Sequence, residues 1–301
     1  MEIVKILDFE NNGVCTVVDG EFLYLGSSGA IGKYRLSDMS LIVHATIINK
    51  IKKTVYTMLR FSIFDEYIFV WDFCDLYIVL KEDLQLLYTV RLGKNSSSDI
   101  CGVLDFDKTN VYVNIRNGRI DIFDINTRQA KRFEISNSTI WAHCIVENRI
   151  YCGTSKGELL EIERFTMRVI RKIQLTKNIA IYSVVFFNDI LYTTSEKSIK
   201  VVDVKTFKII PIELKNDELR AFGVNAGELQ TTEANIIGKC GDNFVIAERR
   251  KIALFDVETL LLRERFDFPT GYRHLRYAVL DGKNVYGSNE HGIYRCTLDG
   301  L

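Results

Sequence analysis

The stretch NVYVNIRNGRIDIFD, residues 110–124, carries the clearest structural pattern in the chain. Apolar and polar side chains alternate in its first half, as they do in a strand whose two faces meet different surroundings. A polar turn containing Gly118 follows, and a second alternating run then ends on Asp124. This order predicts a hairpin of two antiparallel strands.

The same pattern recurs along the chain, for example as FLYLGSSGAIGKYRL at 22–36 and RIYCGTSKGELLEIE at 149–163. The copies begin at residues 22, 67, 110, 149, 190, 244 and 284, so successive spacings are 45, 43, 39, 41, 54 and 40. A period of about 40–45 residues with strand alternation is typical of four-stranded propeller blades. The degenerate copy at 67–81 leaves six or eight blades as alternatives to seven.

Two further strands are expected in each copy. Residues 168–174 alternate charged and apolar side chains, which indicates an outer strand with one wet face. Residues 181–187 are almost continuously apolar, which indicates an inner strand covered on both faces. We therefore predict an all-β fold, a seven-bladed β-propeller with four-stranded antiparallel blades, as a single domain over 1–301.

The two ends of the chain are expected to form one blade together. The last copy stops at Leu298 with no outer strand after it, while residues 2–8 resemble the outer strands elsewhere. An unpaired strand edge invites aggregation. The N-terminal strand, about residues 2–8, is therefore predicted to close the C-terminal blade.

The repeats carry a resemblance to a known family. Phe123-Asp124, Val202-Asp203 and Phe255-Asp256 stand where WD repeats often have Trp-Asp. With the repeat number and spacing, these pairs make the chain resemble a diverged seven-bladed propeller of the WD-repeat superfamily. The usual Gly-His dipeptide and the kelch double glycine are absent. The resemblance implies a non-catalytic protein–protein interaction scaffold.

Composition narrows the class of protein. The 39 basic residues balance 39 acidic ones, and 47% of the residues are hydrophobic, so a disordered chain is excluded. No apolar run approaches the roughly 20 residues needed to span a bilayer, so no membrane insertion is expected. Seven Cys without paired spacing and an N-terminus without a secretory signal indicate a cytoplasmic protein with free thiols.

The charges separate by loop type. Turns between the second and third strands, and links from an outer strand to the next inner strand, should share one face, the top. The candidate partner-binding residues on it are Lys52, Lys53, Lys94, Arg116, Lys156, Lys177, Lys197, Phe222, Arg249, Arg250, Lys251 and Arg273. The remaining turns form an acidic bottom face, where Asp side chains are also expected simply because they stabilise tight turns.

Phe222 belongs to the one long spacing. The excess of about a dozen residues lies within 215–232, which we expect to be a loop insertion between blades. Insertions in repeat proteins often lie on a binding face, but a longer loop is also tolerated at little cost. Both interpretations stay open.

No catalytic, metal-binding or cofactor-binding residue is predicted. His44, His143, His274 and His291 lack metal-ligand spacing, and no Walker, dinucleotide or nucleophile-elbow motif occurs. Trp71 and Trp141 lie in predicted strands and are expected in the core.

Three hypotheses for function follow, with the chain either a monomeric propeller or a subunit of a larger complex. The first is a scaffold that binds a protein partner through the top-face loops. The alternative is a binder of nucleic acid or another phosphate-bearing ligand, or of an acidic surface, through the basic top face. The third is a lactonase-like or hydrolase-like propeller enzyme, with Asp99, Asn235 and His274 near the channel mouth.

Overall fold

The computed structural model describes residues 2–8, 15–27, 29–47, 60–72, 74–92, 100–195, 198–211, 234–248, 251–267, 278–289 and 292–298. The chain divides into two compact units. The first unit comprises 1–116, 120–132 and 269–300, and the second comprises 117–119 and 133–268. The described residues form seven four-stranded antiparallel sheets, four of them largely in the first unit and three in the second.

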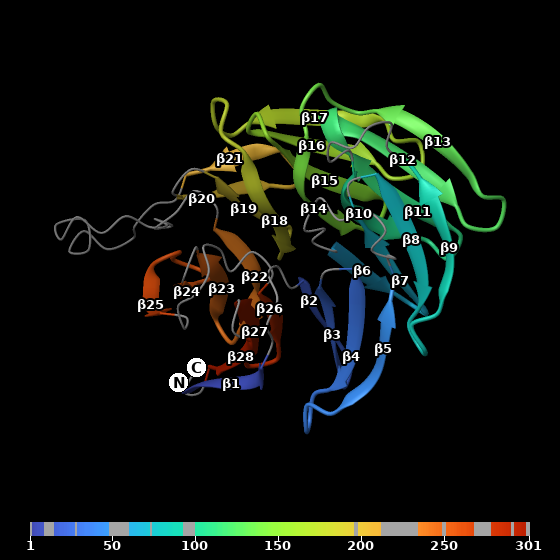
Figure 1. Ribbon diagram of the computed structural model, residues 1–301. Coiled ribbons are helices and arrows are strands. Elements are labelled where there is room, and N and C mark those ends of the chain that lie inside the picture. The colour runs from blue at the N-terminus through green and yellow to red at the C-terminus, as the bar shows by residue number, and fades with distance from the viewer. Residues whose placement is uncertain are drawn as a thin grey trace. The chain divides into compact units, whose positions relative to one another are not determined.

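The first unit holds the sheets of both chain ends and of the first three copies (Figure 1). One short 3₁₀ turn, η1 (Arg116–Gly118), separates β11 from β12. The strands, sheet by sheet, are β1 (Glu2–Asp8), β28 (Gly292–Thr297), β27 (Asn284–Asn289) and β26 (Val279–Asp281); β2 (Cys15–Asp19), β3 (Phe22–Ser27), β4 (Ala30–Arg35) and β5 (Leu41–Thr46); β6 (Arg60–Phe64), β7 (Tyr67–Trp71), β8 (Asp75–Leu80) and β9 (Leu86–Arg91); β10 (Ile100–Phe106), β11 (Asn110–Ile115), β12 (Arg119–Asp124) and β13 (Gln129–Glu134).

The second unit holds the three remaining sheets, each built in the same strand order. Their strands are β14 (Ile140–Val146), β15 (Arg149–Thr154), β16 (Glu158–Glu163) and β17 (Val169–Gln174); β18 (Ile181–Phe187), β19 (Ile190–Ser195), β20 (Ser198–Asp203) and β21 (Lys208–Ile210); β22 (Asn235–Cys240), β23 (Asn243–Glu248), β24 (Lys251–Asp256) and β25 (Leu262–Asp267).

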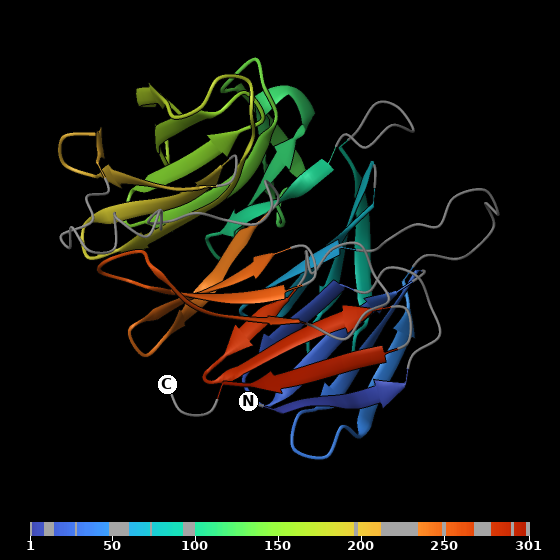
Figure 2. The ribbon, with the colours of Figure 1, turned by 90° about the vertical axis from the view of Figure 1, so that its left-hand side faces the viewer.

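The repeat predicted from the sequence is confirmed. The second strand of each sheet starts at the predicted residue in six copies, and in the sixth copy it starts one residue earlier, at Asn243. The predicted closure by the N-terminal strand is also confirmed. Strand β1 pairs antiparallel with β28 from Glu2 opposite Thr297 to Asp8 opposite Gly292, as the blue and red strands in Figure 2 show.

Apolar side chains fill the space between neighbouring sheets within each unit. In the first unit, Tyr24 and Ile31 of one sheet share a buried cluster with Ile68 and Val70 of the next. In the second unit, Tyr151 and Leu159 do the same with Leu191. Because both faces of these strands are covered, the middle strands are buried almost without interruption, as the apolar runs predict.

The turn between the third and fourth strands is the most regular feature of the repeat. In six sheets, the residue four places after the third strand has a left-handed backbone without being glycine, with φ between 54° and 59°: Met39, Leu84, Arg128, Met167, Phe207 and Leu260. Most of these side chains are deeply buried. Phe207, for example, lies 6.5 Å from the Tyr151 ring of the preceding sheet. The Phe207 turn therefore packs its sheet against the preceding one.

Acidic residues stabilise several of these turns. Asp124 Oδ1 accepts hydrogen bonds from the amides of Asn126 and Thr127 at 2.8 and 2.9 Å, and Asp203 Oδ1 accepts from Thr206 N at 2.6 Å. The acidic residues that accept turn amides in the described part of the chain include Asp38, Asp83, Asp107, Asp124, Asp203 and Asp256. For these six, the turn-forming interpretation of the acidic bottom face is supported.

Candidate functional site

Two aromatic side chains, the exposed Trp141 and the partly buried Tyr182, lie at matching places in neighbouring sheets of the second unit. In β14 the pairing with β15 runs from Ile140–Thr154 to Ala142–Gly153, so Trp141 is an extra residue in a β-bulge. In β18 the pairing runs from Ile181–Ser195 to Ser183–Thr194, so Tyr182 is extra in the same way. A bulge re-aims the side chain of its extra residue and often lies beside functional sites.

The prediction that Trp141 belongs to the core is therefore wrong, whereas that for Trp71 is confirmed. Trp141 is 47% exposed, and Trp71 is 7% exposed. The physical reason is the bulge, which breaks the alternation that otherwise assigns each residue of the strand to a face. The Trp141 and Tyr182 rings, named here the aromatic pair, lie 6.5 Å apart with an interplanar angle of 48°.

The aromatic pair lies where β14 and β18 begin, two strands that pack side by side (Figure 1). This is the top end of both sheets, the end that carries the turns between second and third strands. Lys156 lies in the Ser155–Gly157 turn there and donates from Nζ to Asn137 Oδ1 at 3.3 Å. Lys177 lies in the link between β17 and β18 and is exposed. Two of the predicted top-face cations thus share this end with the aromatic pair.

Backbone hydrogen bonds hold the two lysine-bearing segments together. The amides of Leu175 and Thr176 donate to Gly157 O at 2.9 and 3.3 Å, and Gln174 Nε2 donates to Lys156 O at 2.7 Å. Gly157 has φ +80°, and a Cβ there would lie 2.5 Å from Thr176 O. The close approach requires glycine at this position. These contacts fix the positions of the two segments relative to each other.

The other predicted cations have different surroundings. Lys251 is half-buried, and its Nζ lies 3.3 Å from Asp267 Oδ1. Arg116 is exposed at the start of η1 in the first unit. The remaining candidates lie outside the described residues: Lys52, Lys53, Lys94, Lys197, Phe222, Arg249, Arg250 and Arg273, together with the insertion 215–232.

In the described part of the chain, the residues named for the enzyme hypothesis do not form a site. Asp99 and His274 lie outside it, and Asn235 is the first residue of β22. No group of three or more His, Cys, Asp and Glu side chains is placed to hold a metal ion among the described residues. All seven cysteines are free thiols, and burial raises the pKa of Cys15 to about 11 and of Cys144 to about 12.

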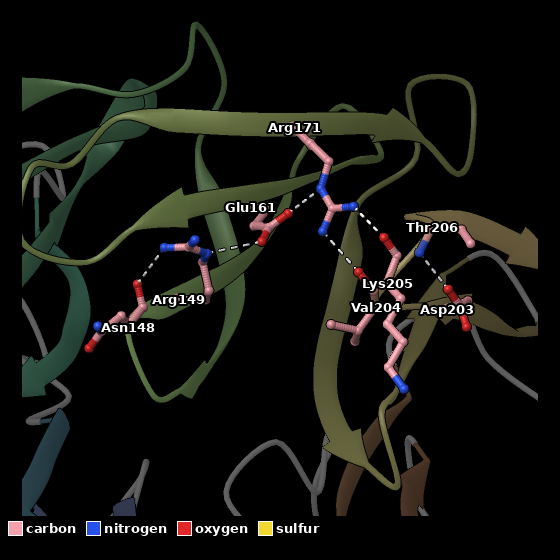
Figure 3. A network of polar contacts seen from close by, with 8 residues as sticks. All are labelled: Asn148, Arg149, Glu161, Arg171, Asp203, Val204, Lys205 and Thr206. Atoms are coloured by element: carbon pink, nitrogen blue, oxygen red, sulfur yellow. Dashed lines mark hydrogen bonds and ion pairs between the residues drawn. The ribbon is translucent and has the colours of Figure 1, made fainter.

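A polar network in the second unit links neighbouring sheets (Figure 3). Arg171 of β17 donates to the buried carboxylate of Glu161, and its two other guanidinium nitrogens donate to Val204 O and Lys205 O at 2.8 Å each. Arg149 Nε lies 3.2 Å from the other Glu161 oxygen. The Arg171 guanidinium bonds to Glu161 in its own sheet and to Val204 and Lys205 of the next sheet, so the network joins the two sheets. The sequence gives no sign of it beyond a charged alternation in β17.

Comparison with known proteins bears on the fold. No protein-family model matches the chain, and no curated protein sequence matches it either. Among solved structures, the WD40 domain of Pan2 from Neurospora crassa superimposes with a TM-score of 0.69 at 12% identity, over 97% of this chain and 90% of that one. The computationally designed protein Ika8 gives 0.67 at 13% identity, over 97% and 99%. The chain thus has a WD40-like β-propeller fold, with seven blades.

The chain's described residues contain no helix with the length and apolar character that crossing a membrane requires.

Proposed function

We propose that this chain is a non-catalytic scaffold that binds a partner protein through the top end of the β14–β17 and β18–β21 sheets. The observation that carries the proposal is the bulge that leaves Trp141 47% exposed, with the partly buried Tyr182 ring of the adjacent sheet 6.5 Å from it. Tryptophan and tyrosine are the residues most often found at the energetic centre of protein interfaces. WD40-like propellers commonly act as interaction scaffolds, which supports the same function by analogy.

The lysines define the chemistry of the partner. Lys156 and Lys177 are exposed at the same end of the sheets as the aromatic pair, and a cation at the rim of an interface favours a negatively charged partner surface. The proposed partner segment therefore carries an apolar anchor for the aromatic pair and acidic residues for the lysines. Seven free thiols support a reducing compartment such as the cytoplasm.

Affinity capture with the full chain tests this proposal. The bait is compared as wild type, as Trp141→Ala, and as Phe165→Ala. Phe165 is 58% exposed in the turn between β16 and β17, at the opposite end of the same sheet, so it is the matched aromatic control. Partners of the top end should be lost with Trp141→Ala and kept with Phe165→Ala. Equal recovery with all three baits would contradict the proposal.

Single-stranded nucleic acid is the second candidate ligand, because the same aromatic pair and lysines provide ring stacking and phosphate pairing. Titrating a labelled 12-mer of uridine with the full chain at 50 and 200 mM salt distinguishes a nucleic-acid ligand from a protein partner. Nucleic-acid binding should weaken steeply with salt and be lost in Lys156→Glu/Lys177→Glu. A protein partner predicts no measurable binding of this oligonucleotide.

A further inference from the structure

The first unit contains a hollow of about 470 Å³ between the sheets β2–β5 and β6–β9, at the bottom end. Four carboxylates line it: Asp19 and Glu21 from the β2–β3 turn, Glu66 from the β6–β7 turn, and Glu82 from the β8–β9 turn.

The wall of the hollow already holds a cation. Lys33 of β4 is 8% exposed, and its Nζ lies 4.3 Å from the centroid of the Phe22 ring and 5.8 Å from that of Tyr24. The same ammonium donates to Lys81 O at 3.4 Å and to Glu82 O at 3.3 Å. Aromatic faces and carbonyl oxygens are the groups that recognise cationic side chains.

Tyr24 contributes an unsatisfied polar group. Its side chain lines the hollow and is fully buried, and in the described part of the chain its hydroxyl has no hydrogen-bond partner. Burial, then the nearby Asp19 charge, raises the pKa of this hydroxyl to about 12, so it keeps its proton at neutral pH. A buried hydroxyl left unpaired is unfavourable, and a ligand that reached it would remove that penalty.

The charge of the hollow selects the sign of the ligand. Its ionisable groups are four carboxylates and two ammonium groups, Lys33 and Lys81, which together give a net charge of −2. Lys81 is already paired with Asp19 at 2.8 Å. The carboxylates of Glu21, Glu66 and Glu82 are therefore the groups that an arriving cation would meet.

We propose that this hollow is a binding site for an arginine or lysine side chain from a basic segment of a partner protein. The side chain enters beside Lys33, whose ammonium already covers the Phe22 ring. Its charge pairs with the Glu66 and Glu82 carboxylates, and the Tyr24 oxygen accepts a hydrogen bond from it. The site lies in a different unit from the aromatic pair and does not depend on it. A Trp141→Ala chain should therefore bind a basic segment as the wild type does.

Fluorescence anisotropy of a labelled tetra-arginine peptide with the full chain tests the site. Glu66→Gln/Glu82→Gln should weaken binding at least tenfold. The control Glu258→Gln/Glu264→Gln removes two exposed carboxylates from the second unit and should change affinity less than twofold. Equal weakening by both pairs, or by neither, would overturn the proposal, because the peptide would then be sensing diffuse charge or nothing at all.

Tyr24→Phe provides the second measurement. Because the hydroxyl has no partner within the described protein, its removal should leave the melting temperature unchanged or raise it while weakening peptide binding several-fold. A lower melting temperature, or unchanged peptide affinity, would show that the hydroxyl does not face a ligand.

Discussion

At the residue scale, close packing at single positions determines how neighbouring sheets meet. Gly153 lies in β15, opposite Ala142 in the strand pairing, immediately beside the bulge that exposes Trp141. A Cβ at Gly153 would lie 2.5 Å from Cγ2 of Ile181, which is completely buried in the next sheet. The absence of a side chain therefore lets the inner strand β18 approach β15.

Gly153→Ala is expected to destabilise the protein by about 1–3 kcal/mol, because the added methyl group overpacks a filled core. Urea denaturation measures the loss. Gly102→Ala is the matched control, since its Cβ would meet only Trp71 Cζ2 at an ordinary 3.8 Å. If both substitutions cost the same, the close approach of β18 to Gly153 is not what requires glycine there.

Asp256 gives a pH-dependent prediction. Arg263 Nη2 lies 2.6 Å from its Oδ2, and this contact, with the Thr259 amide and hydroxyl, lowers the pKa of Asp256 to about 2. A lowered folded-state pKa means that the unfolded chain binds the proton more tightly. The stabilisation is therefore complete above the unfolded-state pKa near 4 and disappears as the pH falls towards 2.

Asp256→Asn should accordingly lower stability at pH 7 by roughly 1 kcal/mol, the usual net value of a hydrogen bond. The difference from wild type should shrink between pH 4 and pH 2, as followed by denaturant melts across that range. A difference that stays constant down to pH 2 would mean that ionisation of Asp256 does not contribute.

At the element scale, the turn after the third strand of the β18–β21 sheet packs against the preceding sheet through Phe207. Phe207 has φ +54°, is 6% exposed and carries the Arg171 guanidinium 4.8 Å above its ring. A left-handed conformation costs a non-glycine residue about 1–2 kcal/mol. Burial of the ring against the β14–β17 sheet has to exceed that cost.

Phe207→Ala should destabilise the protein by about 3–5 kcal/mol, and Phe207→Gly should be no worse, because glycine adopts the left-handed conformation freely. At Leu191, which is buried in the regular strand β19, the order should reverse, with Gly about 0.5–1 kcal/mol less stable than Ala. Thermal melts of Phe207→Ala, Phe207→Gly, Leu191→Ala and Leu191→Gly measure the two differences in stability between Gly and Ala. A Phe207→Gly protein clearly weaker than Phe207→Ala would contradict the account of the turn.

Much of the fold is predictable because its pattern is periodic. The alternation in NVYVNIRNGRIDIFD places β11 and β12 correctly, and the same pattern locates the other copies to within one residue. The bulges at Trp141 and Tyr182 are not predictable in this way, because an extra residue leaves no mark on a short apolar run. The left-handed Phe207 and Leu84 are equally hidden, since glycine is the residue that normally signals such a turn.

The candidate sites are less predictable than the fold for the same reason. Lys156 and Lys177 follow from loop type alone, but the exposure of Trp141 at the same end of the sheets depends on a bulge. The hollow in the first unit needs three turns that are up to about sixty residues apart in sequence, from Asp19 to Glu82. Only the packing of two sheets reveals that these acids gather around Phe22, Tyr24 and Lys33.

At the scale of the whole molecule, a formal charge of zero conceals local surfaces of opposite character. Among the described residues, the second unit presents lysines beside an aromatic pair, and the first unit presents carboxylates around an aromatic wall. A scaffold with two such surfaces can bind an acidic and a basic segment independently. The two proposals together describe a molecule that joins partners of opposite charge.

The most direct test of the central claim is site-specific photo-crosslinking of the full chain in its own cell extract. A photo-reactive phenylalanine analogue replaces Trp141 in one version and Phe165 in the other, and adducts are identified by mass spectrometry. We expect a protein adduct at position 141 that is absent at position 165. The same adducts at both positions, or none at position 141, would contradict it.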